Sequence, residues 1–194
     1  MESALIVSNT DKSTAFFTEM LTAASVGHIA AAQSCAQSRR LLLERDFDLV
    51  IVNAPLRDES GESLSRHIAS REDSQVILIV KSEFFDAVSS ICEEDGVLTV
   101  SKPVNRSVLW SALRLAISAQ SKLKRIKAEN SQLKRKIEDI RVVDRAKCLL
   151  ISHLNISEQE AHRYIEKQAM DVRSTRRVVA EGILKTYGNY KENE

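Results

Sequence analysis

The chain has 194 residues, of which 43% are hydrophobic and 28% charged, and its formal net charge at pH 7 is +1. These values are ordinary for a folded protein, and the length allows one medium-sized domain with a small second module. No apolar run approaches the roughly 20 residues of a membrane span, and the N-terminus lacks a signal-peptide pattern, so we expect a cytoplasmic protein without a membrane partner.

The near-neutral total charge hides an uneven distribution. Residues 1–117 carry 11 Lys and Arg against 16 Asp and Glu, whereas residues 118–194 carry 17 against 11. A basic second half predicts a polyanionic partner for that half alone. A solvated helix flank would have the same composition, so charge by itself leaves both readings open.

Cysteine and histidine positions give no indication of a metal site. Cys35, Cys92 and Cys148 lack metal-ligand spacing, and His153 and His162 have no third or fourth ligand beside them. We expect reduced, mostly buried thiols, and neither a metal nor a cofactor. The sequence also contains no nucleophile motif or phosphate loop, which argues against an enzyme.

The first part of the chain alternates short apolar runs with helical segments. Strands are expected at residues 4–7, 28–32, 48–52, 76–80 and 97–100. Helices are expected at residues 12–25, 33–44, 63–70, 84–92 and 105–119. Five such alternations predict a doubly wound, flavodoxin-like α/β domain with a parallel five-stranded sheet over residues 1–118.

In such a domain, functional groups gather beyond the carboxyl ends of the strands. In this chain those ends carry the polar residues Ser8, Asn9, Asn53, Ser82 and Lys102. Two spacings make the domain resemble the receiver domain of response regulators. Gly61 follows Asn53 by eight residues, and Lys102 with the proline after it follows the fifth strand. The resemblance implies the receiver fold and a role in two-component signalling.

The departures from the receiver pattern bear on function. Ser8 and Asn9 stand where the family has its metal-binding acids, and Asn53 stands where it has the phosphoacceptor Asp. Aspartyl phosphorylation needs a carboxylate nucleophile and a divalent cation, and Mg²⁺ favours carboxylate ligands. We therefore expect a pseudo-receiver that keeps the fold without phosphotransfer. Lys102 would then bond to nearby carbonyls or to Asn53, or the strand ends would dock a sensor protein or a small ligand.

A heptad pattern without Gly or Pro covers residues 109–141. Its seam begins at Leu109, Ala112, Ala116 and Ala119, and it continues through Leu123, Ile126, Asn130, Leu133, Ile137 and Ile140. A sustained 3.5-residue repeat predicts a left-handed coiled coil, and a single Asn at an a position fixes a two-stranded register, so we expect a homodimer. An amphipathic helix packed on its own domain is the alternative. No breaker separates this pattern from the last receiver helix, which predicts one helix of 45–50 residues.

Residues 140–188 predict a small all-α module of three helices. Asn155 is a plausible stop for the long helix, and Ser157 with Glu160 forms a capping box for the next one. Ser174 or Thr175 can cap a third helix that ends at Gly188. Residues 189–194 are expected to be a tail.

This module resembles the ANTAR domain, an RNA-binding antiterminator module. The matching blocks are Ala146-Lys147, Leu149-Leu150, Ser157-Glu158, Glu160-Ala161, residues 167–170, residues 179–181 and Ile183-Leu184. Cys148, His162 and Glu166 depart from the usual pattern, Glu166 by replacing a basic residue. The resemblance implies a dimer that binds two hairpins in an mRNA leader and so prevents a terminator from forming.

The basic residues of the module support a polyanionic partner, because together they can neutralise several phosphates. The candidate RNA-binding residues are Arg141, Arg145, Ala146, Lys147, Arg163, Lys167, Arg173, Arg176 and Arg177. Two alternatives remain at this point. One is an adaptor in which the pseudo-receiver and the coiled coil bind a sensor protein. The other is a DNA-binding regulator, because the last two helices superficially resemble a helix-turn-helix.

Overall fold

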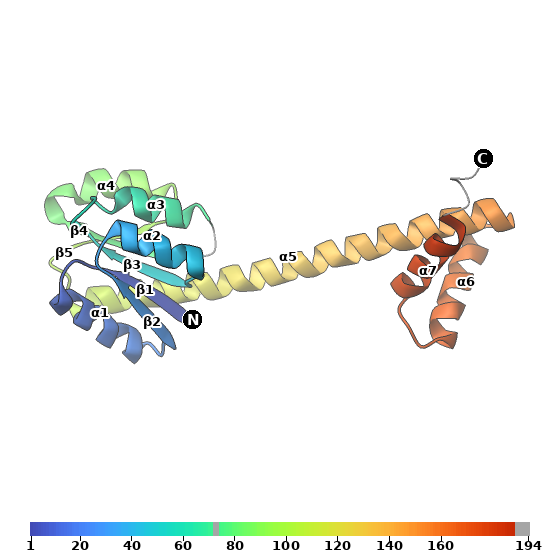
Figure 1. Cartoon of the computed structure of the whole chain (residues 1–194), viewed down its shortest axis with the longest axis horizontal. Coiled ribbons are helices and arrows are strands. Elements are labelled where there is room, and N and C mark those ends of the chain that lie inside the picture. Colours follow the sequence, from blue (N-terminus) through green and yellow to red (C-terminus); the bar gives the residue numbers. More distant parts are fainter. Residues whose placement is uncertain (72–73, 189–194) are drawn as a thin grey trace. The chain divides into compact units, whose positions relative to one another are not determined.

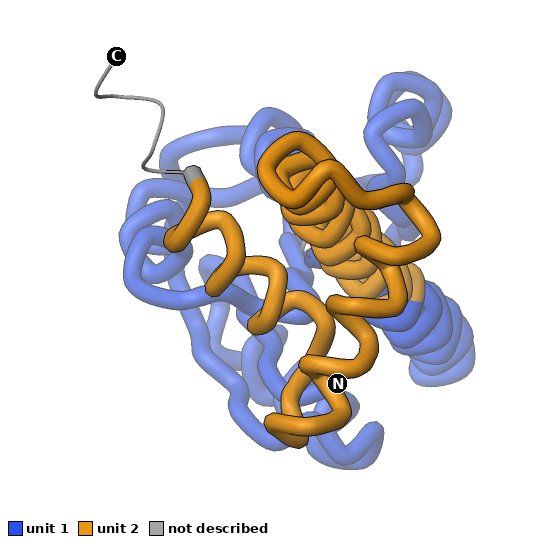
Figure 2. The backbone as a smooth tube through the Cα atoms, turned by 90° about the vertical axis from the view of Figure 1, so that its right-hand side faces the viewer, with its two compact units in different colours: residues 1–125 blue, residues 126–194 orange. Residues whose placement is uncertain are grey.

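The structure is a computed structural model, and it describes residues 1–71 and 74–188. It divides into two compact units, residues 1–125 and 126–194, which Figure 2 colours separately. The predicted tail at residues 189–194 lies outside the described residues. Among the helices of the described residues, none is long and apolar enough to cross a membrane.

The first unit is built on a parallel five-stranded sheet, as the sequence predicts. Its strands are β1 (Ser3–Val7), β2 (His28–Ala32), β3 (Leu49–Asn53), β4 (Gln75–Lys81) and β5 (Leu98–Lys102), in the spatial order β2-β1-β3-β4-β5. Helices α2 (Cys35–Glu44), α3 (Glu62–Ala69) and α4 (Phe85–Glu93) cover one face, and a short 3-10 turn (Ser82–Phe84) precedes α4. Helix α1 (Asp11–Ala23) and the start of α5 (Arg106–Leu154) cover the other face (Figure 1).

The sheet is buried on both faces, which explains why its strands are continuous apolar runs. Successive strand residues point to opposite faces. In β1, Leu5 and Val7 therefore join the core under α2, α3 and α4, while Ala4 and Ile6 join the core under α1 and α5. The carboxyl edge of this sheet holds the polar residues of the predicted pocket.

Helix α5 confirms the prediction of one long helix, because it runs without interruption for 49 residues. It ends at Leu154, and the next residue, Asn155, has a left-handed backbone with φ of +50°. The first unit extends further along this helix than the predicted boundary at residue 118. An ion pair of 2.8 Å between Lys124 and Asp48 ties that extension to the sheet. Burial alone would raise the pKa of Asp48, but Lys124 and the backbone amides of Glu2 and Ser3 lower it.

The prediction that the coiled-coil seam begins at Leu109 is wrong. Leu109, Ala112 and Ala116 are buried in the core of the first unit, packed with α1 and the sheet. They satisfied the heptad pattern because a helix face that packs on a sheet repeats at the same three- and four-residue intervals. These residues therefore have no free surface for a partner chain, and the range 109–141 begins too early for a dimer contact.

The second unit consists of the end of α5 with α6 (Glu158–Asp171) and α7 (Arg176–Gly188). The predicted capping box is present, since the Ser157 side chain accepts from the Glu160 amide and the Glu160 carboxylate accepts from the Ser157 amide. The hydroxyl of Thr175 accepts from the amide of Val178 at 3.3 Å, so it caps α7. The core of the unit is small, and among the described residues its cluster holds seven buried side chains: Val142, Ala146, Leu150, Ala161, Ile165, Ala180 and Ile183.

Gly61, one of the two residues that carried the receiver resemblance, has a steric role. It lies at the start of α3 with φ of +89°, and a Cβ added there would lie 2.9 Å from Cγ1 of Val52. A residue with a side chain would be strained in its backbone and would also collide with β3. The glycine therefore allows α3 to start close against the strand that ends in Asn53.

Gly61→Ala is expected to destabilise the first unit more than Gly96→Ala. Gly96 also has a left-handed backbone, with φ of +74°, but a Cβ added at Gly96 would meet nothing within 4 Å. Gly96→Ala should cost about 1–2 kcal/mol for the backbone alone. The collision at Gly61 should add about 1–3 kcal/mol. Urea unfolding of the two variants measures the difference, and equal losses would contradict the steric role of Gly61.

Candidate functional site

The predicted pocket residues of β1 and β3 lie together at the carboxyl edge of the sheet. Ser8 and Asn53 are both buried, and the Asn53 side-chain amide donates to the Ser8 hydroxyl at 3.1 Å. The side-chain amide of Asn9 donates to the carbonyl of Pro55 at 3.2 Å. Neutral groups thus bond to one another where the receiver family has acids.

The ammonium group of Lys102 bonds to a neutral backbone carbonyl. Its ammonium donates to the carbonyl of Ala54 at 2.6 Å, which is one of the two bonding arrangements expected from the sequence. Burial, and to a lesser extent nearby Lys81, lowers the pKa of Lys102. The Ser82 hydroxyl donates to the backbone carbonyl of Lys102. In the described chain, none of the five pocket residues has a carboxylate as a hydrogen-bond partner.

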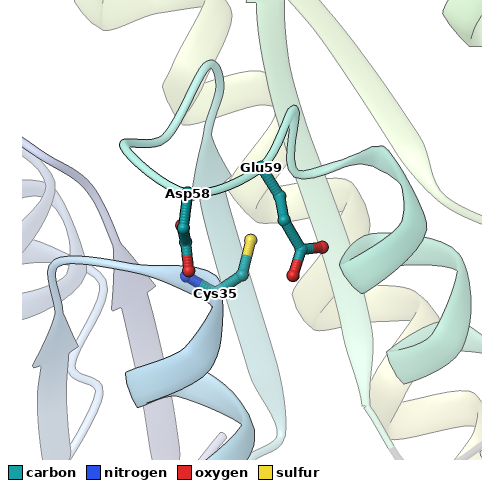
Figure 3. Close-up of side chains that lie close together, drawn as sticks. All are labelled: Cys35, Asp58 and Glu59. Atoms are coloured by element: carbon teal, nitrogen blue, oxygen red, sulfur yellow. The ribbon is translucent and has the colours of Figure 1, made fainter.

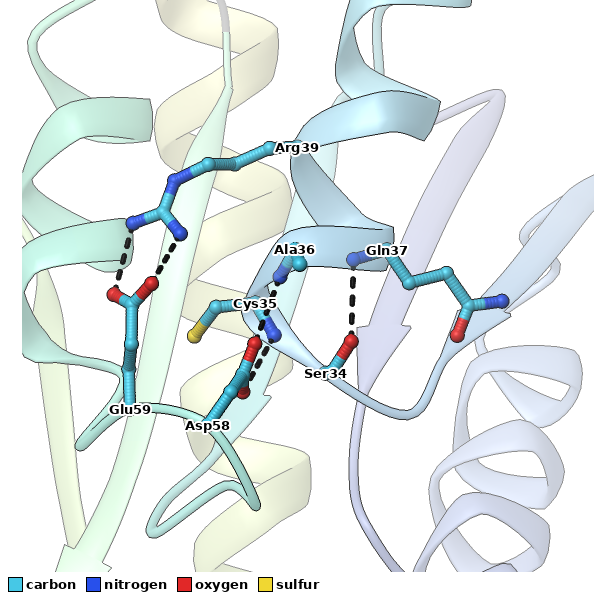
Figure 4. Close-up of polar contacts among 7 residues, drawn as sticks. All are labelled: Ser34, Cys35, Ala36, Gln37, Arg39, Asp58 and Glu59. Carbon is cyan, nitrogen blue, oxygen red and sulfur yellow. Dashed lines mark hydrogen bonds and ion pairs between the residues drawn. The ribbon is translucent and has the colours of Figure 1, made fainter.

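The loop between β3 and α3 is held to α2 by two acids (Figure 4). The Asp58 carboxylate accepts from the backbone amides of Cys35 at 3.0 Å and of Ala36 at 2.9 Å, at the first turn of α2. These amides, Ala36 first, lower the pKa of Asp58. The Glu59 carboxylate makes a two-bond ion pair with the Arg39 guanidinium, one bond of which measures 2.9 Å. Together with Asn9 and Lys102, these contacts fix the loop from three sides.

Cys35, Asp58 and Glu59 form a cluster that the sequence analysis missed (Figure 3). Their sulfur and carboxylate oxygens lie within 4.8 Å of one another, close enough to consider a metal ion. The two carboxylates are already engaged, however: Asp58 by the α2 amides and Glu59 by Arg39. Burial, and then Glu59 and Asp58, raises the pKa of the Cys35 thiol to about 11. The cluster therefore holds the loop in place, and its residues are too far apart in sequence for spacing to reveal it.

The other two thiols differ in burial. Cys92 lies on α4 and is buried in the core of the first unit, as expected. Cys148 is exposed on α5, so two of the three thiols are buried, in agreement with the expectation of mostly buried thiols.

The candidate RNA-binding residues fall into three groups. The first contains only Ala146, for which the prediction is wrong. Ala146 is fully buried between α5, α6 and α7, so it builds the core of the second unit and has no surface for RNA. An alanine at this position lets the helices approach closely. The ANTAR resemblance at Ala146 therefore reflects packing.

The second group is exposed and makes no ion pair with any described residue. Its members are Arg141 and Arg145 on α5, Arg163 and Lys167 on α6, and Arg173 in the loop that follows. Arg163 and Lys167 alternate along α6 with the buried residues Ala161 and Ile165, and so lie on its outer face. These cations are available to a polyanion.

The third group is paired with carboxylates inside the second unit. Lys147 contacts Asp144 at 2.8 Å and Glu158 at 3.2 Å. Arg177 contacts Asp139 at 2.6 Å and Glu181 at 2.8 Å, and Arg176 contacts Glu166 at 3.1 Å. All three cations line one groove, together with His162, Asp139 and Asp144. The groove therefore contains both positive and negative charges.

The later part of the predicted seam is exposed, in contrast to its beginning. The exposed fractions are 46% for Ile126, 59% for Leu133, 51% for Ile137 and 60% for Ile140. Asn130 is also exposed, and Leu123 is partly exposed. A row of four large apolar side chains on one helix is costly in water unless another surface covers it.

Comparison with known proteins agrees with a receiver-like first unit and an ANTAR-like second unit. Residues 131–184 match the ANTAR domain family. The chain is 29% identical over 145 residues to the transcriptional regulatory protein PdtaR of Mycobacterium tuberculosis, and the match covers 75% of this chain and 71% of that protein. The same protein from a second strain of that species matches equally.

Solved structures support the fold of the first unit. The signal receiver domain of an HD domain-containing protein from Pseudomonas fluorescens has a TM-score of 0.56 and 23% identity, and the match covers 64% of this chain and 92% of that one. A response regulator receiver domain from Clostridium thermocellum has a TM-score of 0.55 and 20% identity, with coverage of 63% and 99%.

The family match and the solved structures cover different parts of the chain, and the match to PdtaR extends over parts of both. The sheet and its helices have the fold of receiver domains, and the family match lies within the last third of the chain. The protein is therefore a chain with an ANTAR domain near its C-terminal end and a receiver-like domain before it.

Proposed function

We propose that this protein is a transcription antitermination regulator that binds two-hairpin leader RNA as a dimer. The observation that carries the proposal is the match to the ANTAR family over residues 131–184, a segment on which five of the candidate RNA-binding side chains are exposed without ion pairs to described residues. Such cations can displace counterions from phosphates. The relative in Mycobacterium tuberculosis is a transcriptional regulatory protein, which supports a regulatory role in the cytoplasm rather than an enzymatic one.

The receiver-like domain, in this proposal, does not use phosphorylation of its own. Ser8, Asn9 and Asn53 offer no anionic ligand for a divalent cation, and Lys102 is bonded to a carbonyl. Its input would be a sensor protein or a small ligand that docks at the receiver-like domain. The exposed seam of Ile126, Leu133, Ile137 and Ile140 supports a homodimer.

Binding to RNA tests the proposal directly. The purified protein is expected to retard a two-hairpin leader RNA in low salt, and to bind it more tightly than a scrambled RNA of the same length. The variant Arg141→Gln/Arg145→Gln should weaken binding about tenfold, at roughly 0.7 kcal/mol for each lost contact. It should also reduce the slope of log affinity against log salt by about 1.4–1.8, since each neutralised phosphate contributes about 0.7–0.9.

The control for that experiment is Arg40→Gln/Arg57→Gln, which removes two exposed charges from the receiver-like domain. It should leave RNA affinity nearly unchanged. Equal affinity of the wild type for leader and scrambled RNA would refute RNA recognition. Tighter binding to duplex DNA at matched salt would favour a DNA-binding regulator instead.

Charge placed in the seam should separate the dimer. Leu133→Lys puts an ammonium into an apolar contact between two helices, where it has no partner and is costly to desolvate. Analytical ultracentrifugation should give the mass of two chains for the wild type and of one chain for Leu133→Lys. Ser131→Lys adds the same charge outside the seam and should remain a dimer. A wild-type protein that sediments as one chain at all concentrations would contradict the proposed dimer.

Restoring the acceptor alone should not restore phosphorylation. Asn53→Asp supplies a carboxylate, but Ser8 and Asn9 beside it still provide no acid to hold the cation that phosphoryl transfer needs. We expect no labelling of Asn53→Asp by radioactive acetyl phosphate with Mg²⁺, under conditions that label an active receiver domain. Efficient labelling of this variant would contradict the prediction, because it would show that the pocket can still bind the cation and accept the phosphoryl group.

A further inference from the structure

Arg176 differs from the other two cations of the groove in how firmly it is held. Lys147 is only 15% exposed and Arg177 is 40% exposed, and each contacts two carboxylates. Arg176 is 57% exposed and contacts a single carboxylate, that of Glu166. Exposed single pairs of this kind are weak in water. Arg176 is therefore the paired cation that a competing anion can release most easily.

Glu166 makes its contacts through one oxygen. Its Oε1 accepts from Nη1 of Arg176 at 3.1 Å and also lies 3.3 Å from Nε2 of His162, one helical turn earlier on α6. The Glu166 side chain is 45% exposed, so water reaches the pair. If Arg176 moved to another anion, the Glu166 carboxylate would remain solvated and beside His162, and no buried charge would be left alone.

The surroundings of Arg176 suit a nucleic-acid strand. On one side Arg176 lines the groove that also contains Lys147 and Arg177. On the other side it lines a hollow with Glu166, Met170 and Ser174, and Met170 is 78% exposed. A phosphate bonded to Arg176 would thus have further cations on one side, and an apolar side chain on the other against which an unstacked base can lie.

From this geometry we propose that Glu166 competes with RNA phosphate for Arg176 and thereby sets the RNA affinity of the ANTAR domain. The inference rests on the proposed RNA-binding function. In the free protein Arg176 donates to Glu166. In the complex Arg176 donates to a phosphate oxygen, and Glu166 keeps His162 and water. The carboxylate weakens binding in two ways, because it occupies the guanidinium and repels the incoming phosphate.

The test is Glu166→Gln, which keeps the shape of the side chain and removes its charge. The variant should bind two-hairpin leader RNA about two- to fivefold more tightly than the wild type, in keeping with the strength of an exposed pair. The slope of log affinity against log salt should be nearly unchanged, because Arg176 neutralises the same phosphate in both complexes. Asp171→Asn is the matched control, because it removes an exposed acid from the same helix with no ion pair to a described residue.

A double variant identifies Arg176 as the partner. In an Arg176→Gln background, Glu166→Gln should raise RNA affinity less than it does in the wild-type background, because no guanidinium is left to be released. Circular dichroism melts check that each variant is folded, and Glu166→Ala repeats the test with a side chain that cannot bond to Arg176 at all. If the wild type binds leader RNA and both Glu166 variants bind no better than Asp171→Asn, the inference is overturned while the proposed function stands. If the wild type does not recognise leader RNA, the proposed function itself fails.

Discussion

The structure depends on one helix, α5, which contributes buried side chains to two hydrophobic cores. Near its start, α5 buries Leu109, Ala112, Leu113 and Ala116 under the receiver-like sheet. Near its end it buries Val142, Ala146 and Leu150 under α6 and α7. Neither core is complete without its part of α5. This requirement explains why no glycine or proline interrupts 49 residues, since either would weaken or break the helix between the cores.

The small core of the second unit makes its ion pairs more important than surface pairs usually are. Only eight side chains are buried there among the described residues, seven of them in one cluster, so packing alone leaves little stability to spare. Lys147 links α5 to the start of α6, and Arg177 links α5 to α7 through Asp139. The same residue types that suit a polyanionic ligand therefore also hold the three helices together. This dual use explains why counting basic residues in the sequence overestimates the number that are free to bind RNA.

Much of the architecture could be predicted from local patterns. The apolar runs of β3 and β4, the helix stop at Asn155 and the capping box at Ser157 depend on neighbouring residues, and each occurs where expected. The predictions that failed depend on contacts between residues that are far apart in the sequence. The heptad at Leu109 could not be told from a sheet-facing helix, because both repeat at three and four residues. Burial of Ala146 and the link from Asp58 to Cys35 arise only when separate elements meet.

The paired neutral groups at Ser8 and Asn53 limit what a single substitution at this edge can do. Their amide-to-hydroxyl bond is buried, and the bond from Lys102 to Ala54 is partly buried, so the polar groups at the edge of the sheet are bonded to one another. A carboxylate at position 53 could accept from the Ser8 hydroxyl, but it would be a buried charge without a bound cation, which is costly. If the domain takes its input by another route, as proposed, phosphate signalling would need acids at several of these positions at once, and substitutions at this edge would instead adapt it to that other input.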